Sequence, residues 1–199
     1  MIEFPVMEYF YSVQGEGFYN GNAAFFIRLG GCDVGCVWCD VKESWDADNH
    51  PKMSINQLLD EAQKHPAKIL IITGGEPAMY DLSVLCSTFK NAGYKIHIET
   101  SGAYTLQGSF DWVTFSPKKF KAPLPEVAAI ADELKVVVFN KSDFEWGELH
   151  AKLVPQDCKL YLQPEWDKRD LSQQLIFNYV LKNPDWKVCL QTHKYLGVD

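Results

Sequence analysis

The chain has 199 residues, of which 47% are hydrophobic and 23% charged, and its net charge is −7. No apolar run approaches the ~20 residues that a membrane-spanning helix needs, and an acidic chain lacks the clustered Lys and Arg that neutralise nucleic-acid phosphates. The first ten residues also lack the basic and apolar regions of a secretory signal. We therefore expect a cytoplasmic protein, with residues 1–199 in a single domain, whose ligand is a small molecule.

Apolar runs rich in Ile, Val and Phe follow an extended start and predict buried strands. These runs cover residues 23–29, 68–73, 94–99, 112–116, 134–139, 159–163 and 186–191. Helical patterns cover residues 54–65, 81–91, 144–153 and 170–181, with a weaker one at 125–132. The alternation predicts an α/β fold with a mostly parallel sheet. A doubly wound sheet and an incomplete barrel both fit this pattern.

The helix expected at residues 54–65 has the clearest start, because Ser54 followed by Gln57 is typical of a capping box. Two segments, residues 40–52 and 117–124, interrupt the alternation and are polar, so we expect loops there. No repeat or linker divides the chain.

Three cysteines directly follow the first predicted strand at the spacing CxxxCxxC: Cys32, Cys36 and Cys39. In a reducing compartment this spacing indicates metal or redox chemistry rather than disulfides. A 4Fe-4S cube normally takes four thiolates, so three thiolates leave one iron open to a ligand. A zinc site formed with His50 is the alternative on spacing alone. The remaining three cysteines lie in apolar patterns, where a free thiol behaves as a small buried hydrophobe.

Polar residues gather where the predicted strands end. The second strand ends in Thr73, Gly74, Gly75 and Glu76, where adjacent glycines allow a ligand to approach the main chain and Glu76 can accept from a cation. A plain strand-to-helix turn is the alternative. The later strand ends carry Thr100, Ser101, Ser116, Lys118 and Gln163. Since parallel strands share one carboxyl edge, these residues predict a site lined by loops.

Candidate residues also lie near both ends of the chain. Val13, Gln14, Gly15 and Glu16 join polar groups to flexible backbone before the first buried strand. Arg28 lies inside that strand, so its guanidinium needs a carboxylate, phosphate or ligand partner. A structural ion pair is the alternative for Arg28. Near the other end, a polar segment with His193 follows the last predicted strand.

The cysteine spacing, the Gly-Gly-Glu-Pro segment and the Ser/Thr-bearing third strand end make the chain resemble the radical S-adenosylmethionine (SAM) superfamily. Residues 13–17, 39–40, 116–118 and 191–194 make it similar to the 7-carboxy-7-deazaguanine synthases, and this resemblance covers essentially the whole chain. It implies a single radical SAM domain folded as an incomplete TIM-like β/α barrel.

The resemblance implies a lyase of queuosine biosynthesis that converts 6-carboxy-5,6,7,8-tetrahydropterin to 7-carboxy-7-deazaguanine with loss of ammonia. It implies a 4Fe-4S cluster on Cys32, Cys36 and Cys39, whose open iron binds SAM, and reductive cleavage of SAM to a radical that abstracts hydrogen from C6 of the pterin. The residues implied to bind SAM are Trp38, Gly75, Glu76, Thr100, Ser101, Ser116, Lys118 and Gln163. The residues implied to bind the pterin are Val13, Gln14, Gly15, Glu16, Arg28, Thr73, His193 and Asp199.

Magnesium is also implied by the resemblance, and here the chain departs from the family pattern. The residue after the Cys-Asp pair commonly bears a hydroxyl group that coordinates the ion, but this chain has Val41. Valine has no oxygen for a hard cation. Asp40, Ser44 or water supplies the oxygen instead, or the magnesium dependence is weakened.

Partners are implied as well: a reductant such as flavodoxin or ferredoxin, and a second copy of the chain in a homodimer. No nucleic acid and no membrane is expected as a direct partner. Two alternative functions remain at this point. One is a radical activase that acts on a protein partner through the same cysteine loop, and the other is a zinc-binding module without enzymatic activity.

Overall fold

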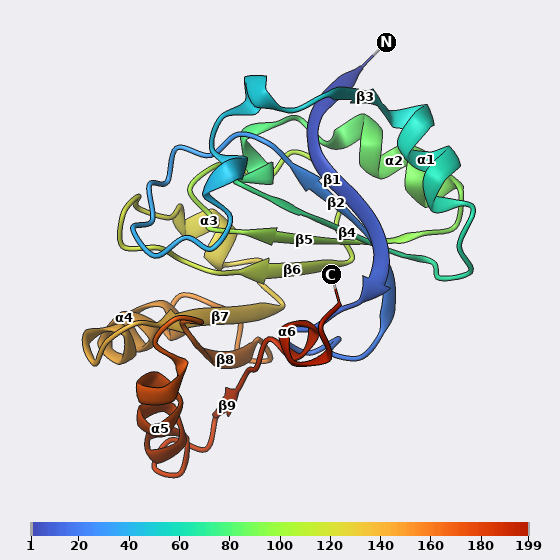
Figure 1. Ribbon diagram of the computed structural model, residues 1–199. Helices are drawn as coiled ribbons and strands as arrows, with labels where there is room; N and C mark the ends of the chain where they lie inside the picture. The colour runs from blue at the N-terminus through green and yellow to red at the C-terminus, as the bar shows by residue number, and fades with distance from the viewer. Residues whose placement is uncertain (1, 199) are drawn as a thin grey trace.

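The computed structural model describes residues 2–198, which form a nine-stranded sheet flanked by helices (Figure 1). In chain order the strands are β1 (Glu3–Val13), β2 (Ala23–Leu29), β3 (Lys52–Ser54), β4 (Ile69–Gly74), β5 (Lys95–Thr100), β6 (Trp112–Phe115), β7 (Glu133–Val138), β8 (Lys159–Pro164) and β9 (Trp186–Val188). In the sheet their order is β3-β1-β2-β4-β5-β6-β7-β8-β9. Strand β1 is antiparallel to both neighbours, and every pair from β2 to β9 is parallel.

The order of the parallel strands distinguishes between the two architectures that the sequence left open. A doubly wound sheet reverses its strand order at a switch point, whereas here the parallel strands follow one another in chain order. The sheet is therefore singly wound, as in a β/α barrel. Strands β3 and β9 remain its two edges, so the barrel is incomplete and the prediction is confirmed.

The first five helices lie where the sequence patterns predict them, within a few residues, and the sixth was not predicted. They are α1 (Ile55–Ala62), α2 (Ser83–Asn91), α3 (Pro125–Ala128), α4 (Ser142–Ala151), α5 (Arg169–Val180) and α6 (Thr192–Leu196). The capping box of α1 is present, since the Ser54 side chain accepts the Gln57 N–H and the Gln57 side chain accepts the Ser54 N–H. Among residues 2–198, none of the helices has the length and apolar character needed to cross a bilayer.

The structure adds detail to the extended start and to the loop at residues 40–52, and it differs from the expectation at the last strand. The extended start is the long strand β1, and the loop expected at residues 40–52 contains the 3₁₀ turns η1 (Lys42–Ser44) and η2 (Ala47–Asn49) before β3 begins. The last strand ends at Val188 rather than at residue 191, and α6 follows it. A five-residue helix closed by Gly197 at φ 67° has too few turns to produce a recognisable period.

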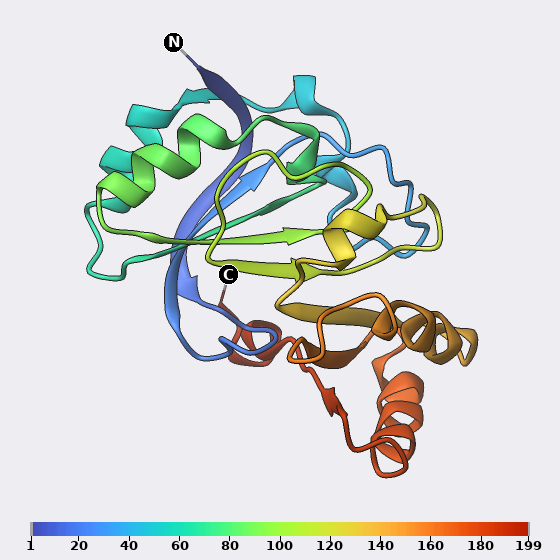
Figure 2. The same cartoon turned by 180° about the vertical axis from the view of Figure 1, so that it is seen from behind.

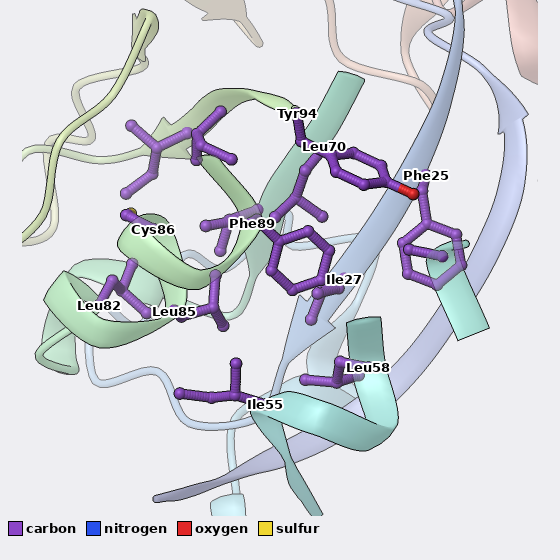
Figure 3. Packing of buried hydrophobic residues seen from close by; sticks show 14 of the residues in the cluster. Phe25, Ile27, Ile55, Leu58, Leu70, Leu82, Leu85, Cys86, Phe89 and Tyr94 are labelled. Atoms are coloured by element: carbon purple, nitrogen blue, oxygen red, sulfur yellow. The ribbon is translucent and has the colours of Figure 1, made fainter. Parts of the chain in front are cut away.

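The two faces of the sheet have different chemistry because side chains alternate along each strand. Phe25 and Ile27 of β2 and Leu70 of β4 point toward α1 and α2, where they form a core with Leu58 and Phe89 (Figure 3). A second core lies between the later strands and the helices α3 to α5, around Phe115, Leu134 and Ile176. The alternate positions of the same strands face the inside of the partial barrel.

Figures 1 and 2 show where the C-terminal helix α6 lies in the fold. Helix α6 lies beside the loop that joins β1 to β2, and the backbone N–H of Thr192 donates to the carbonyl of Gly15 at 2.9 Å. The C-terminal segment therefore covers the inside of the barrel from the side of the β1–β2 loop.

Candidate active site

A cavity of ≈ 360 Å³ lies on the inner side of the sheet, and every predicted site residue in the described part of the chain lines it. These residues are Val13, Gln14, Gly15, Glu16, Arg28, Cys32, Cys36, Trp38, Cys39, Asp40, Thr73, Gly75, Glu76, Thr100, Ser101, Ser116, Lys118, Gln163 and His193. Asp199 lies outside the described residues. The structure thus brings together groups from nearly the full length of the chain.

Strand alternation explains how the interior residues reach this cavity. Arg28 and Thr73 are register partners on β2 and β4, and Glu99, Lys135 and Gln163 occupy inward positions on β5, β7 and β8. Each follows or precedes an outward apolar residue of the core. The pattern that builds the core also builds the polar wall of the cavity.

The cysteine loop is held by main-chain hydrogen bonds to the segment around η1. Cys32 donates its N–H to the carbonyl of Trp45 at 3.0 Å, and Gly31 donates to the carbonyl of Ser44 at 2.6 Å. Burial raises the pKa of the Cys36 thiol to about 11 and also raises that of Cys32. Both thiols therefore hold their protons near neutral pH, and a metal that binds thiolates would displace these protons.

The surroundings of the thiols offer no zinc site that includes His50. Within residues 2–198, no three His, Cys, Asp or Glu side chains converge closely enough to hold one metal ion. Zinc needs all its ligands within roughly 2.3 Å of one centre, whereas a cube distributes its thiolates over different irons. His50 does not line the cavity, and its Nε2 lies 2.9 Å from the carbonyl oxygen of Glu43. The zinc alternative is therefore not favoured.

The carboxylate of Glu76 is buried and fully engaged by neighbouring strand ends. Its Oε1 accepts from Thr100 Oγ1 at 2.6 Å and from the Ala78 N–H at 3.0 Å, while its Oε2 accepts from both the N–H and the Oγ of Ser101. Four donors fill the lone-pair sites of a carboxylate. Glu76 thus fixes the ends of β4 and β5, and the carbonyl of Gly75 receives no hydrogen bond from the described residues.

Gly75 itself is required by the close approach of two loops. A Cβ atom at this position would lie 2.4 Å from the carbonyl oxygen of Gly31 and 2.7 Å from Cβ of Cys32. Real Cβ atoms do not come so close to backbone. The Gly-Gly-Glu-Pro segment leads from β4 into the 3₁₀ turn η3 (Pro77–Met79), as the alternative expected, and it is also packed directly against the cysteine loop.

An ionic network forms the floor of the cavity. Lys135 is 5% exposed, pairs with Glu16 and lies 3.6 Å from Glu99. Burial favours the neutral form of Lys135, but the two carboxylates outweigh it and raise its pKa well above the usual value. Burial likewise raises the pKa of Glu16, but Lys135 lowers it further, with the net result below the usual range. Both groups are therefore charged.

Amide side chains complete this network. Gln163 and Gln191 donate to Oε1 of Glu16 at 3.2 and 2.8 Å, and Gln14 donates to Oε1 of Glu99 at 2.9 Å. Buried polar groups that are fully paired hold their positions closely. The floor is thus a fixed pattern of donors and acceptors of the kind that recognises a heterocycle.

Arg28 of β2 and Lys118, which follows β6, both line the cavity but have different partners. The Nε of Arg28 donates to Glu8 at 2.5 Å, so the structural ion pair is present, although the side chain also lines the cavity. Lys118 donates to Ser116 Oγ at 2.5 Å, lies 5.7 Å from the ring centroid of Trp38 and has a pKa lowered by burial. Among the described hydrogen bonds, the two terminal nitrogens of Arg28 have none.

Sequence reasoning assigned no role to four charged residues of the cavity: Glu99, Lys135, Glu165 and Lys194. Lys135 could have been identified from the sequence. It lies within the apolar run of β7, and a charged group inside an apolar strand needs a carboxylate or ligand partner, as was argued for Arg28 in β2. Glu99 similarly precedes the polar end of β5. Lys194 lies in the short helix α6, which had no detectable pattern.

Comparison with known proteins agrees with this geometry. Residues 26–137 match the model of the radical SAM superfamily. The chain is 48% identical to a 7-carboxy-7-deazaguanine synthase of Synechocystis sp. PCC 6803, covering 99% of this chain and 94% of the relative. It is 50% identical to one of Flavobacterium psychrophilum, covering 98% and 92%, respectively.

A solved structure is also similar. The crystal structure of QueE from Escherichia coli matches with a TM-score of 0.82 and 32% sequence identity, covering 94% of this chain and 93% of that one. Since the superfamily model spans more than half of the chain and the relatives match it over nearly their full length, the chain belongs to the radical SAM superfamily and, within it, to the family of 7-carboxy-7-deazaguanine synthases.

Proposed function

We propose that the protein converts 6-carboxy-5,6,7,8-tetrahydropterin to 7-carboxy-7-deazaguanine with loss of ammonia, on the way to queuosine and related deazapurines. The observation that carries this proposal is the full-length identity to relatives that bear this enzyme's name. The cavity supports it, because three thiols lie at one wall and a fixed array of carboxylates, amides and a lysine forms the floor.

As a radical SAM protein, the chain uses a 4Fe-4S cluster and SAM. We propose that Cys32, Cys36 and Cys39 hold the cluster, and that the free carbonyl of Gly75 accepts from the amino group of SAM. Once bound, the two groups supply the radical that abstracts hydrogen from C6 of the pterin. Trp38 and Lys118 then line the rest of the SAM site, with Ser116 holding the lysine ammonium.

In this proposal the protein binds and orients the pterin. The terminal nitrogens of Arg28 face a carboxylate of the substrate, and Glu16, Glu99 and Gln14 offer acceptors and donors to its ring edge. His193, whose pKa is lowered by burial, is neutral near pH 7 and can donate from one ring nitrogen and accept at the other. Charged groups held by partners do not need to reorganise during the reaction.

The donor set near Asp40 fits magnesium poorly. Val41 has no oxygen in its side chain, the Oγ–H of Ser44 donates to the Val41 carbonyl at 2.6 Å, and Asp40 pairs with Lys194 at 2.7 Å. Magnesium requires near-octahedral oxygen ligands. We therefore route no step of the reaction through this ion.

We also propose the wider setting of the enzyme. The cluster needs a low-potential electron donor such as flavodoxin or ferredoxin, and residues 1–199 act as one domain because the sheet runs without a break from β3 to β9. A homodimer and a cytoplasmic location follow from the family resemblance. A radical activase is not favoured, since the relatives that match nearly the whole chain are named 7-carboxy-7-deazaguanine synthases.

The test is anaerobic reconstitution with iron and sulfide, followed by incubation with SAM, a reductant and the tetrahydropterin, with product detection by mass spectrometry. We expect 7-carboxy-7-deazaguanine and ammonia, which together contain every hydrogen of the substrate, so the abstracted hydrogen is returned and 5′-deoxyadenosine should not accumulate in step with product. Arg28→Ala should retain the cluster absorbance and lose most turnover, while Cys158→Ala, outside the cavity, should keep both. A protein that binds the cluster and SAM but leaves the pterin unchanged would refute the proposed substrate.

A further inference from the structure

Asp40 and Lys194 form an ion pair at the rim of the cavity between the cysteine loop and α6. Their Nζ and Oδ2 atoms are 2.7 Å apart, and both side chains line the cavity. The Lys194 side chain is 22% exposed, and its ammonium also lies 4.9 Å from the ring centroid of Trp166. The pair joins residues that are 154 positions apart in the chain.

This pair occupies the place where the family resemblance puts a divalent cation. A magnesium ion beside Asp40 would neutralise the carboxylate and offer positive charge to an anionic ligand in the cavity. Here the neighbouring Val41 offers no oxygen, and the Lys194 ammonium already neutralises Asp40. The Lys194 ammonium thus offers positive charge to an anionic ligand in the cavity without a metal ion.

We propose that Lys194 takes the place of magnesium in this chain and binds the carboxylate of the pterin together with Arg28. An ammonium has three N–H donors, and among the described hydrogen bonds only the one to Asp40 is made. Two donors remain available toward the cavity. This proposal rests on the proposed function, because it specifies how the carboxylated substrate is held.

The other cations of the cavity are engaged elsewhere. Lys135 pairs with Glu16 in the floor, and Lys118 donates to Ser116 beside Trp38. Their charges are offset by buried partners or directed to the SAM side of the cavity. Lys118 also makes one hydrogen bond only, but it lies beside Trp38, so Lys194 and Arg28 are the partly used cations of the described lining that remain for the pterin carboxylate.

The first experiment measures binding of 6-carboxypterin, an aromatic analogue without a hydrogen at C6, by calorimetry on the enzyme loaded with cluster and SAM. We expect the same Kd in EDTA and in excess Mg²⁺. Lys194→Gln should weaken binding by about tenfold or more, Mg²⁺ should not restore it, and Lys194→Arg should keep most of the affinity because it retains the charge.

Lys121→Gln is the matched control. Lys121 pairs with Asp33 at 2.6 Å beside the same cysteine loop, its side chain is 32% exposed, and it does not line the cavity. This variant should leave the Kd unchanged. Equal weakening by both substitutions would show a general loss of charge near the loop and would overturn the assignment to Lys194.

A double variant tests the idea in the opposite direction. Val41→Thr with Lys194→Gln supplies the missing hydroxyl and removes the ammonium, so analogue binding should become dependent on Mg²⁺. If EDTA instead weakens binding to the unaltered enzyme tenfold, the proposal is wrong while the proposed function stands. If the unaltered enzyme forms no product from the tetrahydropterin with or without Mg²⁺, the proposed function fails and takes this proposal with it.

Discussion

Gly15 lies so close to His193 that a Cβ atom on the glycine would be 2.0 Å from Nδ1 of the imidazole. The contact joins the β1–β2 loop to α6 and places both residues at the same wall of the cavity. The backbone N–H of Thr192 donates to the carbonyl of Gly15 beside it. Two segments at opposite ends of the chain are thereby fitted to each other with no space for a methyl group.

We predict that Gly15→Ala displaces the His193 ring and weakens binding of 6-carboxypterin about as much as His193→Ala does. The double variant should then bind no more weakly than His193→Ala alone, because both changes act on the same contact. Calorimetric Kd values for the four proteins form the complete cycle. Additive losses would show that Gly15 contributes to binding independently of His193.

Gly75→Ala is predicted to reduce cluster content. The added methyl group would meet the Gly31 carbonyl and Cys32 and would push the cysteine loop away from β4. Iron and sulfide analysis after reconstitution should show a loss approaching that of Cys32→Ala, while the far-UV circular dichroism spectrum stays that of the unaltered protein. Full cluster content in the alanine variant would contradict this prediction, because it would show that the cysteine loop can move away from Gly75 and still bind the cluster.

Lys135→Met is predicted to destabilise the fold by about 3 kcal/mol, since it leaves Glu16 and Glu99 buried without their cation. Lys90→Met is the control, because Lys90 pairs with Asp111 at a more exposed site. Its loss should stay below about 1 kcal/mol. Urea unfolding of the apo-proteins measures both. Similar values for the two variants would contradict the description of a buried network.

Glu133 is predicted to make stability depend on pH in a way that Glu133→Gln removes. Burial raises the pKa of Glu133 to about 7, despite the Phe18 N–H that donates to it. The folded state thus holds this proton more tightly than the unfolded state does. The stabilising contribution is complete below pH 4.5 and is lost as the pH rises through 7.

The variant should accordingly gain roughly 2 kcal/mol over the unaltered protein between pH 5 and pH 8. Measuring the difference between the two proteins cancels the titration of Glu16 and of the other shared groups. Urea midpoints across this range are the readout. A difference that does not change with pH would place the Glu133 carboxyl in a more solvated site than its 2% exposure indicates.

Much of the fold could be predicted because its signals are local. The apolar runs that became β2 and β4 to β8, and the capping box of Ser54 and Gln57, depend on neighbouring residues alone. The strand order could not be read in this way, since a doubly wound sheet and a barrel use the same alternation. Helix α6 was missed because its position is fixed by contact with Gly15 rather than by its own pattern.

The candidate site was predictable wherever a short motif carries the chemistry. The cysteine spacing and the segment around Gly75 and Glu76 were recognisable, and the structure places them side by side. The ion pairs of Lys135 and Lys194 could not be predicted, because in each pair the two charged residues are far apart in the sequence. The hydrogen bonds that Thr100 and Ser101 donate to Glu76 could not be predicted either, because they depend on which strand ends are neighbours in the fold.

The floor of the cavity also bears on the order in which the chain folds. Glu16 contacts Lys135, Gln163 and Gln191, which lie 119, 147 and 175 residues away. Neighbouring parallel strands instead pair over short sequence distances, so the sheet can grow stepwise from the N-terminal side. Because closing long loops costs more chain entropy than closing short ones, we expect the floor of the cavity to form after the cysteine loop, whose main-chain hydrogen bonds reach only as far as Ser44 and Trp45.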